Sequence, residues 1–172
     1  FTGHPFEGKK VNKVSLDAEG NLWVLTDQGI LIRKSEDDDF MEMNVPDCSS
    51  CNFQSISYDN RHVWLGCEGS IYRYTYTDDS LSRFVTTQDS SFLFKDMHML
   101  HDDKMLCCSP EGIMIVNKKA GDHYKQTHKL RELSASLMDS KGRLWLAFYN
   151  SGVEVYDISS GKLIKSYKSG NS

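Results

Sequence analysis

The sequence has no excess of basic residues, no long apolar run and no extended segment of helical period. Its 172 residues carry 20 Lys and Arg against 24 Asp and Glu, a formal net charge of -4. It therefore lacks the basic field that draws proteins to nucleic acid or anionic lipid. No apolar run is long enough to cross a bilayer. We expect neither a nucleic-acid partner nor direct membrane contact.

Cysteine is present in an odd number, five, which argues against a disulfide scaffold but allows one bridge. Cys48 and Cys51 have C-x-x-C spacing, but no second Cys or His pair at matching spacing accompanies them. Two free thiols are favoured here, a local disulfide is the next alternative, and a zinc site is the least favoured. Cys107 and Cys108 are neighbours on a predicted strand and should face opposite ways, with one of them in the core.

A phrase near the N-terminus returns near the C-terminus. DAEGNLWVL at 17–25 is almost repeated as DSKGRLWLA at 139–147. A third tryptophan lies between them in RHVWLG, and a leucine takes its place in KMLCCS. Successive copies are spaced 41, 42 and 39 residues apart, and a fixed period of this size is the signature of a repeat architecture. The four equivalent positions are Trp23, Trp64, Leu106 and Trp145.

Each copy contains four short apolar runs. In the first copy these are VNKVSL, LWVLT, ILIRK and FMEMNV, bounded by Asp, Gly, Asn and Ser. Such runs are too short for helices and are rich in the residues that favour strands. Four antiparallel strands in about 40 residues, repeated, make the blade of a β-propeller. The sequence therefore predicts an all-β fold of four four-stranded blades.

The repeat divides the chain into one domain with blades at about 11–51, 52–93, 94–132 and 133–168. Residues 1–10 precede the first strand of copy one, whereas copy four already has its own last strand. We interpret residues 1–10 as the tail of a preceding blade. The predicted fold is then an arc of a larger propeller, of the seven-bladed type. A closed four-bladed ring is the alternative, in which the N-terminal stretch would pair with the last blade.

The repeated residues have structural explanations. One blade cannot bury both of its faces, so the same large apolar positions must recur at the contacts between blades. We expect Trp23, Trp64, Leu106 and Trp145 at these contacts. Asp side chains can bond backbone N–H groups two residues on, and Gly supplies the positive φ of a tight turn. The predicted turn residues are Asp17, Gly20, Gly29, Gly69, Gly112, Asp139, Gly142 and Gly152.

The pattern Val-x-Lys-Val-Ser-Leu-Asp-x-x-Gly-Asn-Leu-Trp-Val-x-Thr-x-x-Gly-Ile over residues 11–30 resembles the two-component regulator propeller repeat. The resemblance extends over four copies. Copy three departs from it, because Leu106 replaces the aromatic residue and the turn lacks its Gly. That repeat builds the extracytoplasmic sensor region of hybrid histidine kinases in polysaccharide-degrading Gram-negative bacteria.

The resemblance implies a periplasmic domain, the extracytoplasmic part of an inner-membrane receptor, that detects a carbohydrate breakdown product. The signal would pass to a kinase module outside this chain, so the chain itself is expected to be no enzyme and to need no cofactor. Implied partners are an oligosaccharide or other small ligand, neighbouring blades, and a second subunit in a homodimer. The alternatives are a protein-docking or dimerisation scaffold without its own small-molecule site, and a propeller lyase or glycosidase.

Ligand contacts are expected on the propeller face that carries the turns between the second and third strands of each blade. The same face carries the segments that connect one blade to the next, which we call the hand-over segments. Sugars favour an aromatic platform with amides and carboxylates nearby. Tyr149 with Asn150 is the best such pair. We assign no catalytic residue and no metal ligand, because neither His98 nor His101 accompanies a convincing nucleophile and acid. The remaining ligand candidates are Asp27, Gln28, Phe53, Gln54, Glu68 and Phe92.

Overall fold

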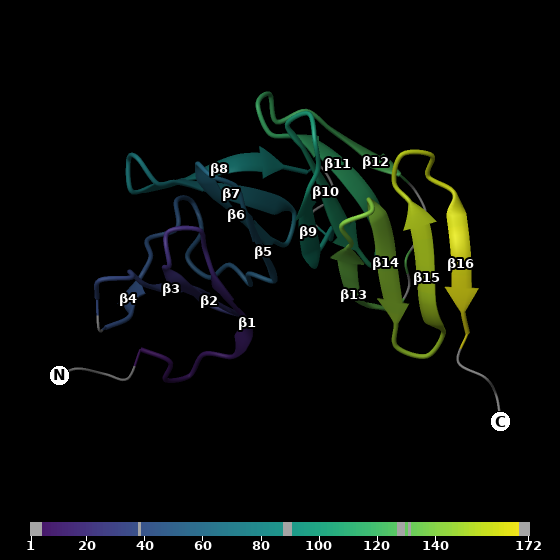
Figure 1. Ribbon diagram of the computed structural model, residues 1–172. Coiled ribbons are helices and arrows are strands. Elements are labelled where there is room, and N and C mark those ends of the chain that lie inside the picture. Colours follow the sequence, from purple (N-terminus) through teal and green to yellow (C-terminus); the bar gives the residue numbers. More distant parts are fainter. Residues whose placement is uncertain (1–4, 38, 88–90, 127–129, 131, 169–172) are drawn as a thin grey trace.

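The computed structural model describes residues 5–37, 39–87, 91–126, 130 and 132–168. These residues form sixteen strands and no helix, so the described part of the chain has no helix that could span a membrane. The strands make four antiparallel sheets, and in each sheet four consecutive strands pair in chain order (Figure 1). The prediction of an all-β fold with four four-stranded blades is confirmed.

The strands of each sheet, or blade, have the following bounds. Blade 1 contains β1 (Val11–Leu16), β2 (Leu22–Thr26), β3 (Gly29–Arg33) and β4 (Met41–Glu42). Blade 2 contains β5 (Ser55–Tyr58), β6 (His62–Cys67), β7 (Ser70–Thr75) and β8 (Ser80–Thr86). Blade 3 contains β9 (Asp96–Met99), β10 (Lys104–Ser109), β11 (Gly112–Asn117) and β12 (His123–Gln126). Blade 4 contains β13 (Leu133–Met138), β14 (Arg143–Phe148), β15 (Gly152–Asp157) and β16 (Leu163–Tyr167).

The blades follow one another in an arc, as a propeller requires. The first strands of successive blades contact each other, β1 with β5, β5 with β9 and β9 with β13. Figure 1 shows these first strands on the inner side, with β4 and β16 at the two outer ends. Inside each blade, tight turns reverse the chain, and the six glycines named above all adopt positive φ. Hairpins of this kind use Gly because other residues are strained there.

Three apolar cores lie between the blades. The first joins Trp23 of blade 1 to Tyr74 of blade 2, whose rings meet edge to face with centroids 5.1 Å apart. The second joins Trp64 to Met105 of blade 3. The third joins Leu106 to Leu144 of blade 4. The first three repeat residues, Trp23, Trp64 and Leu106, therefore each pack against the following blade.

Trp145 differs from the other repeat positions, because no following blade covers it within the part of the chain that the structure describes. Its side chain is only partly buried and stacks on Tyr167 of its own blade at a centroid separation of 6.4 Å. The expected blade-to-blade contact is thus absent among the described residues. The two neighbouring cysteines also correct an expectation: Cys107 and Cys108 are both fully buried, because each lies in a different interblade core.

A hydrogen bond links the turn and the tryptophan in three of the four copies. The Trp23 indole N–H donates to the carboxylate of Asp17 at 2.7 Å, and Trp145 donates to Asp139 at 2.9 Å. In blade 2, Trp64 donates to Asp59 at 3.2 Å. The same carboxylates also accept from backbone N–H groups of their own turns. The turn aspartate therefore orients the large ring that the interface requires, a role that turn chemistry alone did not suggest.

Candidate ligand-binding face

One face of the arc carries the β2–β3, β6–β7, β10–β11 and β14–β15 turns together with the segments that hand over between blades. Backbone hydrogen bonds tie the two sets together. The Phe53 N–H donates to the Thr26 carbonyl at 3.1 Å, and the Gly69 N–H donates to the Phe92 carbonyl at 2.9 Å. Loops from neighbouring blades therefore form a continuous surface on this face.

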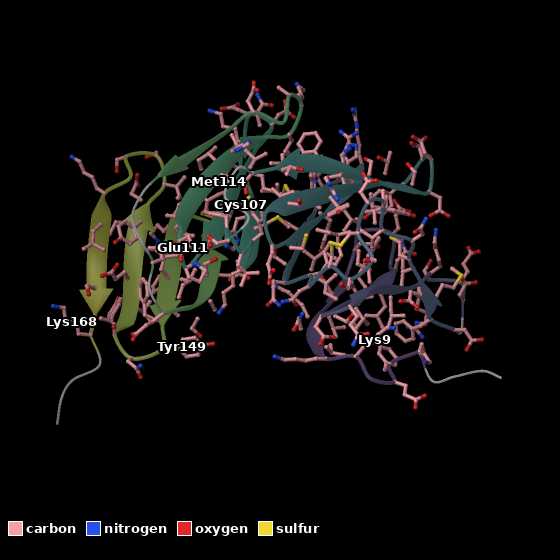
Figure 2. The ribbon with its side chains drawn as sticks, turned by 180° about the vertical axis from the view of Figure 1, so that it is seen from behind. Lys9, Cys107, Glu111, Met114, Tyr149 and Lys168 are labelled. Carbon is pink, nitrogen blue, oxygen red and sulfur yellow. A yellow bond between two sulfur atoms is a disulfide. The ribbon has the colours of Figure 1, made fainter. Side chains whose placement is uncertain are left out.

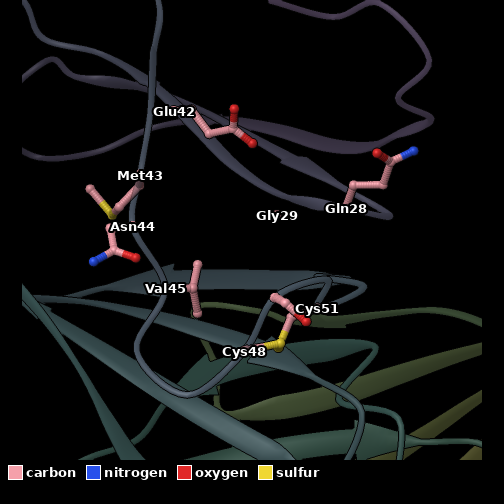
Figure 3. Close-up of a pocket in the computed structure, with 9 residues that line it drawn as sticks. Gln28, Gly29, Glu42, Met43, Asn44, Val45, Cys48 and Cys51 are labelled. Atoms are coloured by element: carbon pink, nitrogen blue, oxygen red, sulfur yellow. A yellow bond between two sulfur atoms is a disulfide. The ribbon is translucent and has the colours of Figure 1, made fainter.

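A pocket of about 380 Å³ lies between the β2–β3 turn and the segment that connects β4 to β5 (Figure 3). Gln28 stands on one wall and the disulfide-bonded pair Cys48 and Cys51 on the opposite wall. Met43 and Val45 pack against the first interblade core. The pocket thus combines the apolar side chains of Met43 and Val45 with amide, carboxylate and hydroxyl groups. Its lining residues are Gln28, Gly29, Glu42, Met43, Asn44, Val45, Cys48, Ser49 and Cys51.

The disulfide corrects the expectation of two free thiols at Cys48 and Cys51. Their Cα atoms are 5.9 Å apart, a separation typical of disulfides. Two side chains of blade 2 also bind the backbone of the β4–β5 segment. The Tyr72 hydroxyl donates to the Pro46 carbonyl at 3.3 Å, and Arg83 donates to the Asp47 carbonyl at 2.8 Å. The disulfide and these two hydrogen bonds therefore hold the segment that forms this wall of the pocket in place.

Three carboxamides meet beside the pocket, and we call Asn12, Asn52 and Gln54 the amide cluster. The Asn52 side-chain oxygen accepts from Asn12 at 2.8 Å and from Gln54 at 2.7 Å. Asn52 in turn donates to Glu68 at 3.4 Å. Since Cys51 lines the pocket and Asn52 belongs to the cluster, one short segment builds both. Amides arranged in this way offer directional donors and acceptors to hydroxyl groups.

Tyr149 lies in the β14–β15 turn and its side chain is 69% exposed. Figure 2 shows Tyr149 on the lower side of the view, beneath blade 4, while Lys9 lies on the same lower side beneath blade 1. The ammonium group of Lys95 lies 5.4 Å from the centroid of its ring and also donates to the Leu133 carbonyl at 2.9 Å. A cation over the ring restrains the aromatic face without covering it fully. Asn150, the next residue, is exposed.

The other predicted ligand residues separate into exposed and buried ones. Gln28 lines the pocket and donates to the Gly8 carbonyl at 2.7 Å, and the Asp27 carboxylate accepts from the Lys10 N–H at 2.8 Å. Phe53 and Phe92, in contrast, are fully buried, so their side chains do not face a ligand. The reason is that the hand-over segments turn these rings inward to fill the interblade cores.

A polar network near the axis joins three blades. Lys13 of β1 donates to Asp96 of β9 at 3.0 Å, and the same carboxylate accepts from the Ser136 N–H of β13 at 2.8 Å. The Ser136 hydroxyl also lies 2.7 Å from Nε2 of His98. Burial lowers the pKa of His98, which outweighs the raising effect of Asp96. Because Asp96 binds Ser136 and not the imidazole, the group lacks the orienting acid of a nucleophile triad.

The sequence reasoning missed Asn12, Lys95 and this axial network. Asn12 and Lys95 lie at or next to the start of first strands, whereas ligand contacts were expected in the turns and in the segments between blades. Their common signal is a polar residue eleven positions before the repeat residue, Trp23 or Leu106. Both donate to a backbone carbonyl of the next blade, Asn12 to Phe53 at 2.9 Å. Among the described residues, no group of three or more His, Cys, Asp or Glu side chains is arranged to hold a metal ion.

No protein-family model and no curated protein matches the sequence. Solved structures do match its fold. The extracellular domain of the one-component system BT4673 from B. thetaiotaomicron is 14% identical with a TM-score of 0.71, over 85% of this chain and 21% of that chain. The extracellular domain of the hybrid two-component system BT3049 from the same organism is 18% identical with a TM-score of 0.66, over 93% of this chain and 23% of that one.

A catalytically inactive virginiamycin B lyase from Staphylococcus aureus is also similar, at 14% identity and a TM-score of 0.73, over 95% of this chain and 57% of that chain. The chain therefore spans less than two thirds of the length of each of these structures. At such low identity the likeness concerns the fold. It confirms the propeller arc, and the similar structures include the class of extracellular sensor domain that the repeat pattern resembles.

Proposed function

We propose that this chain is a ligand-sensing part of the extracytoplasmic region of a hybrid two-component receptor, and that it detects a carbohydrate breakdown product. The observation that carries the proposal is the segment 48–54. It supplies the disulfide wall of the pocket and, through Asn52 and Gln54, most of the amide cluster. The repeat pattern and the fold shared with sensor domains support the receptor role.

The chemistry of the face suits a saccharide. The exposed ring of Tyr149 offers a surface on which the C–H face of a sugar can stack, and the amide cluster offers partners for hydroxyl groups. The disulfide supports a periplasmic location, because such bonds persist in oxidising compartments. To signal, the ligand must bind one receptor geometry better than another. The pocket lies between the β2–β3 turn of blade 1 and the segment that leads from blade 1 to blade 2, so a bound sugar could favour one arrangement of these two blades.

The first prediction concerns binding. Isothermal titration of a panel of oligosaccharides should give heat with at least one glycan, and Tyr149→Ala should weaken that binding about tenfold, which corresponds to about 1.4 kcal/mol. Gln54→Ala should weaken it by a similar factor. Tyr58→Ala is the matched control, because Tyr58 is also an exposed tyrosine (43%) but lies at the far end of β5.

Unchanged affinity in both Tyr149→Ala and Gln54→Ala would place recognition elsewhere, and a panel without any binding would reject the sensing proposal. The same incubations can be assayed for products. Turnover of a glycan would favour the lyase or glycosidase alternative over a sensor.

The second candidate function is an assembly scaffold, and one observation favours it. Large apolar side chains are exposed on both outer blades, among them Leu16 at 58% and Leu137 at 61%. Exposed apolar residues on a sheet face mark a surface that another protein element can cover.

A further inference from the structure

Lys95 is a half-buried lysine on the candidate face, and its surroundings are neutral. Its ammonium group donates to the Leu133 carbonyl at 2.9 Å and lies 5.4 Å from the centroid of the Tyr149 ring. Glu132, the exposed residue next to Leu133, contacts Tyr149 through its backbone carbonyl at 3.0 Å. Among the described residues, no carboxylate forms an ion pair with Lys95. Its positive charge is therefore not neutralised locally.

The other half-buried lysines in the described part of the chain all have an acidic partner. A charge that loses part of its hydration is costly unless it is paired, so proteins usually supply a counter-charge. Lys95 departs from this pattern, and a bound ligand is a candidate for the missing anion. The pairs formed by the other half-buried lysines are Lys9 with Glu42, Lys13 with Asp96, Lys34 with Asp79, and Lys118 with Asp59.

Lys95 occupies a position of the repeat that is polar in every blade. The residue after it, Asp96, pairs with Cys108, which lies two positions after the repeat residue Leu106. The same pairing rule identifies the equivalent residue in the other blades, where it is a carboxamide twice and a hydroxyl once. Each lies where a first strand begins, on the candidate face. We call these four residues the first-strand row: Asn12, Gln54, Lys95 and Ser134.

The first-strand row separates two kinds of chemistry along the face. Asn12 and Gln54, in blades 1 and 2, both donate to Asn52 and belong to the amide cluster. Lys95, in blade 3, lies beside the exposed ring of Tyr149 in blade 4. A saccharide that spans the row would meet directional amide groups at one end and a cation beside an aromatic ring at the other.

We propose that the saccharide sensed at this face is acidic, an inference that rests on the proposed function, and that Lys95 binds its anionic group while Tyr149 contacts the sugar ring. A lysine ammonium has three N–H donors. One is directed to the Leu133 carbonyl, which leaves donors for an anionic oxygen. Because lysine acts as a compact point charge and not as a planar fork, the anionic group is a carboxylate or a sulfate ester.

Isothermal titration with matched ligand pairs tests this assignment. The first set contains uronic-acid oligosaccharides, each with its methyl ester, and the second contains sulfated oligosaccharides, each with its desulfated form. At least one acidic member should bind about tenfold more tightly than its neutral partner, because charge-assisted hydrogen bonds are stronger than neutral ones. A preference confined to one set identifies the anionic group. Sodium chloride at about 0.5 M should weaken binding of the acidic member only, since salt screens exposed charges.

Substitution of Lys95 assigns the preference to a residue. Lys95→Gln should remove the preference and leave the affinity for the neutral member unchanged, which also shows that the variant is folded. Lys95→Arg should retain most of it, because the charge is kept. Lys104→Gln is the matched control, since Lys104 is an exposed lysine of the same blade at the opposite end of β9.

The outcomes separate this proposal from the sensing function on which it rests. Neutral glycans that bind as tightly as their acidic partners would overturn the acidic ligand and leave carbohydrate sensing in place. A preference that survives Lys95→Gln would overturn the role of Lys95. Absence of binding by every member of both sets, together with the wider oligosaccharide panel, would reject the sensing function itself.

Discussion

The tryptophans inside the arc and the tryptophan at its end make an instructive comparison. Trp64 and Trp145 occupy the same position of the repeat, and each donates its indole N–H to the aspartate of its own turn. Trp64 is nevertheless 1% exposed, while Trp145 is only partly buried. Local chemistry therefore orients the ring, and the neighbouring blade decides how much the ring contributes to stability.

The largest expected effect separates these two positions directly. Trp64→Ala should lower the free energy of unfolding by about 3–5 kcal/mol, because it removes a buried ring and leaves a cavity between blades 2 and 3. Trp145→Ala should cost clearly less, since part of its ring already contacts water. Urea unfolding at neutral pH, read by circular dichroism, measures both. Equal losses would show that burial by the next blade does not determine how much the ring contributes to the free energy of unfolding.

The next effect tests close packing in the interior. A Cβ at Gly66 would lie 2.3 Å from the Ser55 hydroxyl oxygen and 2.6 Å from the Cβ of Phe94. Gly66→Ala should therefore destabilise the protein by about 1–3 kcal/mol through overpacking. Ala135→Val adds carbon at an exposed position on blade 4 and should change stability by less than about 0.5 kcal/mol. Similar losses in the two variants would contradict a tightly packed interior and an open end.

The smallest expected effect is a pH dependence of the free energy of unfolding, and it arises from Asp59 at the contact between blades 2 and 3. Burial alone would raise the pKa of Asp59, but hydrogen bonds from the Arg61 amide, Lys118 and Trp64 outweigh it and lower the pKa to about 2. A carboxyl with a lowered folded-state pKa stabilises the fold above its unfolded pKa. This contribution is lost as the pH falls from about 5 to about 2.

The ion pair with Lys118, at 3.1 Å, joins blade 2 to the end of β11 in blade 3. Because Asp59 is partly open to solvent, the loss should be on the order of 1 kcal/mol. Comparing Asp59→Asn with the parent protein at pH 7 and pH 3 measures it. The difference between the two proteins should shrink at pH 3, and a constant difference would argue against the titration of Asp59.

Much of the architecture could be predicted from the chain because the repeat is local in its chemistry. The spacing of Trp23, Trp64 and Trp145 indicated blades, and the glycines of the turns adopt the positive φ that hairpins need. The exposed aromatic at Tyr149 lies in the turn that the strand pattern indicated. These features depend on residues within one blade, where sequence distance and spatial distance agree.

The site was less predictable because its contacts cross between blades. Asn12 reaches Asn52 forty residues away, and Lys13 reaches Asp96 across 83 residues. Phe53 has the composition of a ligand-contacting aromatic, yet it packs against Tyr72 with centroids 5.5 Å apart. No local pattern distinguishes an aromatic that faces solvent from one that a hand-over segment turns into the core.

The sequence by itself determined the unit: a four-stranded blade with an aspartate turn, a large apolar side chain and a glycine hairpin, repeated four times with a leucine in place of the tryptophan in the third copy. Those features follow from backbone preferences and from short-range hydrogen bonds. Both depend on residues that are close in the sequence, so they do not require the neighbouring blades. Only the tertiary structure decided which rings are buried and which polar groups meet at the candidate site. These depend on the packing of one blade against the next, and that packing joins residues that are about 40 or more positions apart.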